Sequence, residues 1–343
     1  MVESGIHITG VGTALPGPPL DNAMLGRFFS NGRVFEQWID TFVGTRTRHL
    51  AVDLDTGDVR YSLADLGETA GRRALAAAGV LAEDIDLVVM GTATPDALMP
   101  ATVNLIADRL GIDGVPTYQL QSGCTGAIQA LDVASQMLAN GRGRTALVLG
   151  GDVCAKHVDL GIDPEKLAPS ELVNIVLFGD GAGAVVLSSE PVADAPLIRR
   201  VLVRFTGRNR APGQVVEWFG MADRADGRVA FREDFKAIEE QVPAMSVEIL
   251  EELLAGESWL AADLDYLLPP QLSVRMTEQI VKQLGVSNAE EVSCIADTGN
   301  AANALPFFQL ERLLPLMVSG QRAITIAVES SKWIKGGIAL EKV

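Results

Sequence analysis

The sequence predicts an α/β fold in which helices pack against a mostly parallel sheet, and two observations carry this prediction. Short apolar runs bounded by Gly, Asp or Pro alternate along the chain with longer segments of helical periodicity. The alternation occurs twice, once in each half of the 343 residues. Strands that alternate with helices are typical of a layered α/β fold, so we expect two similar halves.

In the first half, buried strands alternate with amphipathic helices. The strands are expected at 6–11, 87–90, 117–120 and 146–149, and the helices at 62–78, 101–110 and 125–140. The last helix has Ile128, Leu131 and Met137 at helical spacings. It stops at Asn140-Gly141, a sequence that favours a helix C-terminus.

The second half repeats this rhythm. Strands are expected at 264–268, 292–296 and 324–328, helices at 274–284 and 305–314, and each half closes with a further strand, at 184–187 and 337–340. Pro, Ala and acidic residues cluster at 189–196, which divides the chain into residues 1–190 and 191–343. The segment 208–232 is rich in Gly and charge with little periodicity, so we expect a long excursion that shapes substrate access.

The composition is that of a globular protein with a large core. Hydrophobic residues make up 48%, and no apolar run approaches the roughly 18 residues of a membrane span. Met1 is not followed by a basic and apolar leader, and three cysteines do not make a disulfide framework, so a cytoplasmic location is expected. The net charge of −16 argues against nucleic-acid and anionic-membrane partners. Three scattered histidines and three scattered cysteines predict no metal site.

The segment 121–127 is the strongest candidate for chemistry. A strand ends, a Gly-flanked turn follows, and a helix is expected to begin at Cys124. The positive end of a helix favours a thiolate, and the free N–H groups of its first turn can stabilise an oxyanion. Most free cysteines are simply small buried hydrophobes. The Gly-Cys-Thr-Gly context nevertheless favours a nucleophile for covalent acyl transfer.

Four segments in order resemble the β-ketoacyl-ACP synthase III branch of the thiolase superfamily. They are 38–39 with 44–49 (Trp-Ile and Gly-Thr-Arg-Thr-Arg-His), 122–126 (Ser-Gly-Cys-Thr-Gly), 178–184 (Phe-Gly-Asp-Gly-Ala-Gly-Ala) and 297–302 (Asp-Thr-Gly-Asn-Ala-Ala). The resemblance covers nearly the whole chain. It implies a thiolase-like five-layered α-β-α-β-α fold built from two similar halves, a homodimer, and an acyltransferase that carries its acyl group on Cys124. The donor would be a coenzyme A or acyl carrier protein thioester, with no cofactor bound permanently.

The resemblance carries over the family's catalytic asparagine but not its histidine. In the family, these two residues hydrogen-bond a thioester carbonyl and stabilise the enolate that decarboxylation produces. Asn300 matches the asparagine, whereas Pro270 stands at the histidine position, 30 residues earlier (300 − 270 = 30). Proline has no side-chain donor and no backbone N–H. Ser273 is a candidate substitute donor, and His157 lies in a segment that the family uses near its pantetheine entrance.

A second departure lies near the C-terminus, where the family has a glycine-rich loop that supplies an oxyanion N–H. This chain reads Val-Glu-Ser-Ser-Lys-Trp at 328–333. The backbone N–H of Ser330 or Ser331 is therefore expected to complete an oxyanion hole with that of Cys124. Glu329 follows an apolar strand, and burial would raise the pKa of its carboxyl group and suit it to general-base work in place of the histidine.

The resemblance also implies residues on the cofactor side of the site, which bind coenzyme A or the carrier protein. Trp38 and Lys156 match positions that hold the adenine end of coenzyme A, and Arg275 matches an arginine that docks the carrier protein. The family usually has arginine at the positions of Lys156 and Phe42, so planar stacking on coenzyme A would be weaker here. A carrier-bound donor is therefore favoured.

Three functions are compatible with these residues. The first is acyl transfer from Cys124 to a hydroxyl, amine or carbon nucleophile without decarboxylation, in polyketide or fatty-acid-like specialised metabolism, and the missing histidine favours it. The second is decarboxylative condensation to a β-ketoacyl thioester with Asn300 and a substitute donor. The third is a partner subunit of a heterodimeric ketosynthase, although retention of Cys124 and Asn300 argues against a complete loss of function.

Overall fold

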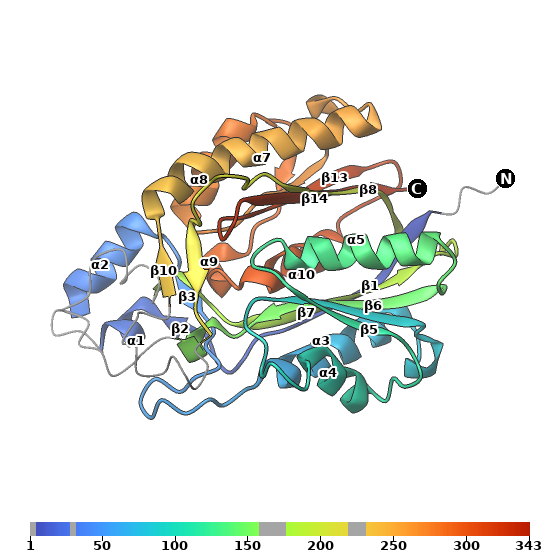
Figure 1. Ribbon diagram of the computed structural model, residues 1–343. Helices are drawn as coiled ribbons and strands as arrows, with labels where there is room; N and C mark the ends of the chain where they lie inside the picture. Colours follow the sequence, from blue (N-terminus) through green and yellow to red (C-terminus); the bar gives the residue numbers. More distant parts are fainter. Residues whose placement is uncertain (1–4, 28–31, 158–175, 219–230) are drawn as a thin grey trace.

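The computed structural model describes residues 5–27, 32–157, 176–218 and 231–343, and it has five alternating layers of helix and strand (Figure 1). Helices form the two outer layers and the central layer. The outer helices are α3 (Leu63–Ala78) and α4 (Thr102–Leu110) on one side and α7 (Phe235–Glu257) and α8 (Val274–Leu284) on the other; α5 (Gly126–Ala139) and α10 (Leu305–Leu313) lie between the strands. The predicted thiolase-like α-β-α-β-α fold is confirmed.

The strands of the two halves have the same order and the same directions. In the first half the order is β1 (Ile6–Ala14), β7 (Gly181–Ser188), β6 (Thr145–Asp152), β4 (Leu87–Thr92), β5 (Thr117–Gln121). In the second it is β8 (Pro196–Phe205), β14 (Ile334–Lys342), β13 (Arg322–Glu329), β11 (Tyr266–Leu268), β12 (Glu290–Glu291). In both, the first two pairings are antiparallel and the last two are parallel. A short antiparallel pairing between β1 and β8 joins the strands of the two halves into one 10-stranded sheet.

The central helix α5 positions the turn that carries Cys124, the predicted nucleophile, because the helix is buried by both halves. Ile128 and Leu131 are fully buried and pack in one core with strand residues of both halves, including Val148 and Ile338. Burying such a side chain contributes about 1.5–3 kcal/mol. A Cβ at Gly91 would lie only 2.3 Å from the Gly126 carbonyl, so only glycine lets β4 approach the start of α5 this closely. The start of α5 is therefore fixed where the halves meet.

Local capping signals explain why the outer helices begin and end where they do. Ser62 and Asp65 form a capping box at the start of α3, and Gly79 ends it with φ 66°. Ser273 caps α8 by accepting a hydrogen bond from the backbone N–H of Met276. The smaller elements are α1 (Asn22–Gly26), α2 (Gly32–Phe42), α9 (Ile295–Thr298), β2 (Leu20–Asp21), β3 (Thr47–Arg48), β9 (Gln214–Val216) and β10 (Phe231–Glu233).

The expected strand at 292–296 is wrong. The chain pairs with β11 only at Glu290 and Glu291, and α9 begins at Ile295. The reason is a side chain from elsewhere: Gln271 Oε1 accepts hydrogen bonds from the backbone N–H groups of Cys294 (2.9 Å) and Ile295 (2.8 Å), which starts a helical turn.

Two long elements were not predicted, and the expected excursion has some order. Neither α7, with 23 residues, nor β8, with 10, was identified from the sequence. In the segment 208–232, residues 219–230 lie outside the described part of the chain, and the flanking strands β9 and β10 pair with each other.

No helix in the described ranges is long and apolar enough to cross a membrane.

Candidate active site

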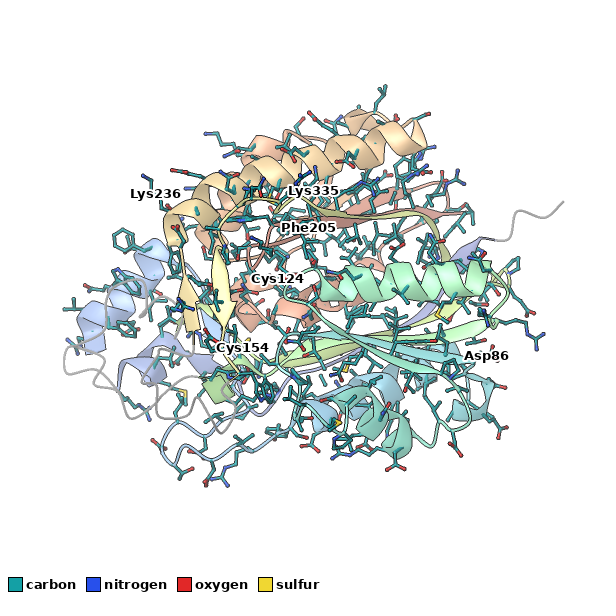
Figure 2. All side chains as sticks on the ribbon, viewed as in Figure 1. Asp86, Cys124, Cys154, Phe205, Lys236 and Lys335 are labelled. Carbon is teal, nitrogen blue, oxygen red and sulfur yellow. The ribbon has the colours of Figure 1, made fainter. Side chains whose placement is uncertain are left out.

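Cys124 lies in the turn that connects β5 to α5 and is half-buried (Figure 2). The turn is closed by a hydrogen bond from the Gly126 N–H to the Gly123 carbonyl at 2.8 Å. Thr125 is the N-cap residue, so the helix begins at Gly126, two residues after the nucleophile. The predicted strand, turn and helix are confirmed, with the helix start shifted past Cys124.

A buried network from the C-terminal half holds this turn, and no sequence motif indicated it. Asn303 accepts a hydrogen bond from the Ala127 N–H (2.9 Å), and its amide nitrogen donates to the Ser122 carbonyl (3.1 Å) and to Asp152 Oδ2 (2.8 Å). Asp152 is completely buried, and its other oxygen accepts hydrogen bonds from residues 92–94, at the end of β4. Asn303 therefore fixes the position of the turn at residues 122–125, which we call the nucleophile turn after the role predicted for Cys124.

Glu329 lies directly against the nucleophile turn. It is 3% exposed, so its predicted burial is confirmed. Its Oε2 accepts hydrogen bonds from Ser122 Oγ (2.8 Å) and Thr125 Oγ1 (2.7 Å), and its Oε1 accepts from Ser331 Oγ. A Cβ at Gly123 would lie 3.0 Å from the Glu329 carboxyl carbon. The Glu329 carboxylate therefore packs against the backbone of Gly123, the residue that precedes Cys124.

Gln129 sets the direction of two of these hydrogen bonds. Its Nε2 donates to Ser122 Oγ at 2.6 Å and to Thr125 Oγ1 at 2.9 Å. Because each hydroxyl then receives a donor from Gln129, each directs its own proton to the Glu329 carboxylate. The network holds Glu329 as an acceptor.

The electrostatics of Cys124 contradict the expectation of a stabilised thiolate. Burial, followed by the negative charges of Glu329, Asp152 and Glu233, raises the pKa of the Cys124 thiol well above its ordinary value. The helix that was expected to favour the thiolate begins only at Gly126. Cys124 is therefore a thiol at neutral pH, and the predicted attack of this residue on a thioester would require a proton acceptor.

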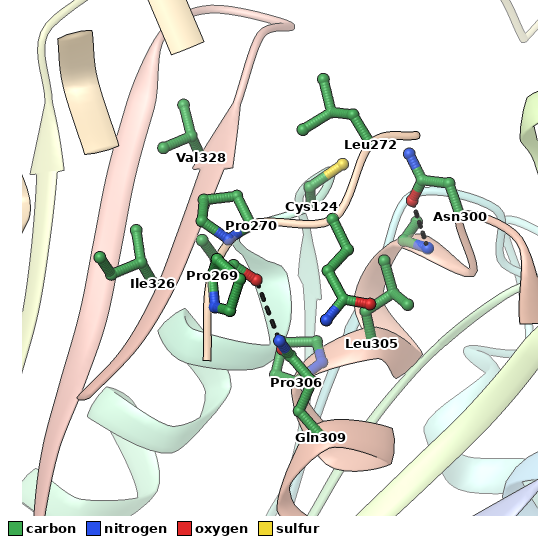
Figure 3. A pocket seen from close by; sticks show the side chains of 13 residues that line it. Cys124, Pro269, Pro270, Leu272, Asn300, Leu305, Pro306, Gln309, Ile326 and Val328 are labelled. Atoms are coloured by element: carbon green, nitrogen blue, oxygen red, sulfur yellow. Dashed lines mark hydrogen bonds between the residues drawn. The ribbon is translucent and has the colours of Figure 1, made fainter. Parts of the chain in front are cut away.

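Cys124, Asn300 and Pro270 line one pocket of about 330 Å³, which includes space open to solvent (Figure 3). Its wall is mostly apolar, formed by Pro269, Leu272, Ala302, Leu305, Pro306, Ile326, Ala327 and Val328, with Gln271 and Gln309 as further polar residues. Asn300 Oδ1 accepts a hydrogen bond from the Ala302 N–H at 3.1 Å. Figure 3 shows the Asn300 amide nitrogen on the side of the Cys124 sulfur, where it can donate to a bound carbonyl.

The place expected for a histidine offers no side-chain donor. Pro270 lines the pocket, and the neighbouring Gln271 is buried with its carboxamide oxygen occupied by Cys294 and Ile295. Ser273 does not line this pocket, and its hydroxyl caps α8. The proposal of Ser273 as the substitute donor is therefore corrected: the residue is a helix cap.

His157 does not replace the histidine either. It does not line the pocket with Cys124. Its ring centroid lies 6.3 Å from that of Trp218, and its Nε2 is buried without a hydrogen-bond partner in the described part of the chain. Burial, and then the charge of Lys156, lower the pKa of His157 to about 4, so it is neutral at pH 7.

Ser330 and Ser331 lie in the turn between β13 and β14. The Ser331 hydroxyl binds Glu329, and the Ser330 carbonyl accepts a hydrogen bond from the Gly213 N–H at 3.0 Å. Neither serine lines the pocket, whose wall from this hairpin is formed by residues 326–328. Their backbone role in an oxyanion hole stays a prediction.

The three residues expected on the cofactor side lie in two places. Trp38 on α2 stacks on Phe35 with ring centroids 5.8 Å apart, and Arg275 Nε lies 3.3 Å from the Thr41 carbonyl at the end of the same helix. Lys156 instead donates from Nζ to the carbonyls of residues 94 and 95, each at 2.7 Å, and burial lowers its pKa. Trp38 and Arg275 are therefore on adjoining elements, whereas Lys156 is held against the loop after β4.

Sequence profiles and a curated relative match this chain. The profile described as 3-oxoacyl-[acyl-carrier-protein] synthase III matches residues 118–202, and that of the thiolase N-terminal domain matches residues 44–158. The β-ketoacyl-[acyl-carrier-protein] synthase III of Neisseria meningitidis is 30% identical over 302 residues, which cover 87% of this chain and 86% of the relative.

Solved structures match over nearly the full length. AbyA1, a tetronic acid condensing enzyme, is 57% identical with a TM-score of 0.95 and coverage of 98% and 99% of the two chains. The 3-oxoacyl-(acyl carrier protein) synthase III of Pseudomonas aeruginosa PAO1 is 27% identical, with a TM-score of 0.84 and 98% of each chain covered. The priming β-ketosynthase of the R1128 polyketide pathway is also 27% identical, with a TM-score of 0.82 and coverage of 98% and 96%.

Proposed function

The chain belongs to the β-ketoacyl-ACP synthase III family of acyltransferases, and from this premise we propose that it transfers an acyl group from Cys124 to an acceptor without decarboxylation. One observation carries the proposal: Pro270 lines the pocket beside Cys124 and Asn300 at the place where a histidine was expected. Decarboxylation leaves an enolate whose negative charge needs donors aimed at it. With Pro270 in place of the expected histidine, the pocket wall has one hydrogen-bond donor fewer.

The identity of 57% with a tetronic acid condensing enzyme supports a specific acceptor. A tetronic acid is a five-membered lactone with an enolised carbonyl β to the lactone carbonyl. Such a ring forms from an α-hydroxyacyl thioester and a β-ketoacyl thioester through one C–C bond and one C–O bond. The carbon between the two carbonyls of a β-ketoacyl thioester is already acidic, so its acylation needs no loss of carbon dioxide. We therefore propose a β-ketoacyl thioester as the acceptor, in specialised metabolism.

The proposed reaction has three balanced steps. In the first, the Cys124 sulfur attacks the α-hydroxyacyl thioester, the donor thiol leaves, and the thiol proton of Cys124 passes to it. In the second, the acceptor carbon loses a proton and attacks the acyl group, so that a C–C bond forms, the C–S bond to Cys124 breaks, and the departing Cys124 thiolate takes up a proton. In the third, the hydroxyl group attacks the acceptor thioester, the lactone C–O bond forms, and the second thiol leaves with the hydroxyl proton.

The residues around the pocket supply the groups that these steps require. We propose that the Asn300 amide polarises the thioester carbonyl, and that the backbone N–H groups of Cys124 and of Ser330 or Ser331 stabilise the tetrahedral oxyanion. Glu329 would accept the Cys124 proton during loading, because its carboxylate lies against the nucleophile turn and is held there by three hydroxyl donors. The apolar pocket wall would bind the acyl chains.

A carrier protein and a second copy of this chain are the proposed partners. The exposed Arg275 and the half-buried Trp38 on adjoining elements fit an acidic carrier and its pantetheine arm. The strand β5 ends the sheet order, so one of its edges pairs with no strand in the described part of the chain and can pair with a second copy. Exposed apolar side chains near this edge support a homodimer: Tyr118 is 41% exposed, Leu98 70% and Met99 87%.

Intact-protein mass spectrometry tests the proposed loading. The wild type and Cys124→Ala would be incubated with lactoyl-coenzyme A and with the lactoyl thioester of an acyl carrier protein. We expect a mass gain of one lactoyl group in the wild type and none in Cys124→Ala. No gain with either donor or with a wider acyl panel would refute the self-sufficient transferase and favour the partner-subunit alternative.

A further inference from the structure

Glu233, the last residue of β10, is a half-buried residue with one buried carboxyl oxygen, and the roles above do not use it. Its Oε1 accepts a hydrogen bond from Gln214 Nε2 on β9 at 2.5 Å. Its Oε2 is buried and has no hydrogen-bond partner, and no cation pairs with this carboxyl group among the described residues. Buried carboxylate oxygens are almost always hydrogen-bonded, because an unpartnered one costs free energy. A buried carboxylate oxygen without a hydrogen-bond partner therefore points to a functional role for its residue.

The ladder of β9 and β10 is held against the hairpin that carries Glu329. The Gly213 N–H donates to the Ser330 carbonyl at 3.0 Å, and Trp333 Nε1 donates to the Ala211 carbonyl at 2.6 Å. Figure 2 shows Cys124 at the end of α5 that faces these strands. The same hairpin carries Glu329, whose carboxylate binds the hydroxyl groups of Ser122 and Thr125 on either side of Cys124, so the ladder lies beside the nucleophile turn. The negative charge of Glu233 is among those that raise the pKa of the Cys124 thiol.

The other charged groups on these packed elements have partners of their own. Arg210 donates to Gln241 at 2.5 Å, Arg232 pairs with Glu217 at 3.2 Å, and the Lys332 ammonium donates to the Arg210 carbonyl. Asp234 caps α7. Glu329 is occupied by three hydroxyl donors. Of the two carboxyl groups near Cys124 on these elements, only Glu233 has a buried oxygen without a partner.

We propose that Glu233 accepts the proton of the acceptor substrate's nucleophilic carbon and returns it to Cys124 at the end of the condensation step. This inference rests on the function proposed above. The carboxylate removes the proton as the carbon attacks the acyl group. The C–C bond forms, the C–S bond breaks, and the Cys124 thiolate takes the proton from the Glu233 carboxyl group. Both residues then return to their starting states.

The chemistry of the two residues suits this exchange. Burial raises the pKa of Glu233 to about 7, so that near neutral pH the group can accept a proton and also donate one. The thiol of Cys124 has a raised pKa, so the departing thiolate readily takes that proton back. Glu329 and Glu233 would then serve different halves of the reaction, loading and transfer.

A single-turnover experiment separates transfer from loading. The enzyme is first loaded with lactoyl-coenzyme A and freed of excess donor. It is then mixed with acetoacetyl-N-acetylcysteamine, and loss of the acyl adduct is followed by intact mass from about pH 5 to about pH 9. The variants are Glu233→Gln and Glu233→Ala, and the matched control is Glu240→Gln, which removes an exposed carboxylate on α7.

We expect Glu233→Gln to load Cys124 to the wild-type extent but to transfer the acyl group about 100-fold more slowly. Its transfer rate should also lose the rise near pH 7 that the wild type and Glu240→Gln show. Sodium formate should partly restore transfer in Glu233→Ala, which a purely structural role would not allow. Transfer by Glu233→Gln within twofold of the wild type, or an equal loss of its loading, would overturn the inference. Failure of the wild type to load or transfer would refute the proposed function itself.

Discussion

Replacement of Glu329 by glutamine should change two properties of Cys124 in opposite directions. The substitution keeps the size of the side chain but removes the charge that the three hydroxyl groups bind. A neighbouring unit charge changes a pKa by about 1 to 3, which corresponds to roughly a tenfold to a thousandfold change in thiolate population. Glu329 is the first of the carboxylates that raise the pKa of this thiol, so its removal lowers that pKa.

The two consequences are separated by two assays on the same protein. Alkylation of Cys124 by iodoacetamide at pH 8 depends on the thiolate population, and we expect it to become at least about tenfold faster in Glu329→Gln. In the proposed mechanism Glu329 accepts the Cys124 proton during loading by lactoyl-coenzyme A, so we expect loading to become about 100-fold slower. Glu240→Gln on the exposed face of α7 should change neither rate. Loading by Glu329→Gln at the wild-type rate would refute the general-base role.

Three further predictions follow from the same geometry. Asn303→Ala removes two neutral hydrogen bonds and one to the Asp152 carboxylate, so the free energy of unfolding measured in urea should fall by about 4 kcal/mol and loading should slow; an unchanged urea midpoint would contradict this. Pro270→His places a donor in the pocket wall, and carbon dioxide release from malonyl-coenzyme A should rise at least about tenfold, whereas no rise would weaken the role given to this position. Arg275→Ala should raise the KM of a carrier-bound donor severalfold but not that of lactoyl-N-acetylcysteamine; an equal effect on both would argue against carrier docking.

Much of the fold was predictable because its signals are local. Strands 87–90 and 146–149 are continuous apolar runs, and α3 and α8 begin at serine caps and end at glycine. The expected strand at 292–296 failed because Gln271, more than 20 residues away, caps α9 through its side chain. No local pattern records such a contact.

The site was predictable where family motifs mark it. Cys124, Asn300 and Pro270 were identified in the sequence and line one pocket. Asn303 and Glu233 were missed because the contact of the first and the role proposed for the second depend on the fold: Asn303 binds a turn that begins 181 positions earlier, and Glu233 accepts a hydrogen bond from Gln214 on the neighbouring strand.

Ser273 shows the opposite error. Its sequence context, a serine immediately before a run with helical periodicity, is the ordinary signal of an N-cap. The interpretation as a substitute donor relied on its place three residues after Pro270. The capping signal was the better guide, because it describes what the hydroxyl binds.

The central claim is that this enzyme joins its two substrates without decarboxylation, and the products of one reaction test it most directly. The enzyme would be given lactoyl-coenzyme A with acetoacetyl-N-acetylcysteamine, and separately with malonyl-coenzyme A, while products, free thiols and carbon dioxide are quantified. We predict 3-acetyl-5-methyltetronic acid from the first mixture, with two thiols released per product and no carbon dioxide. A β-ketoacyl thioester from the second mixture with one carbon dioxide per product, and no product from the first, would contradict the account.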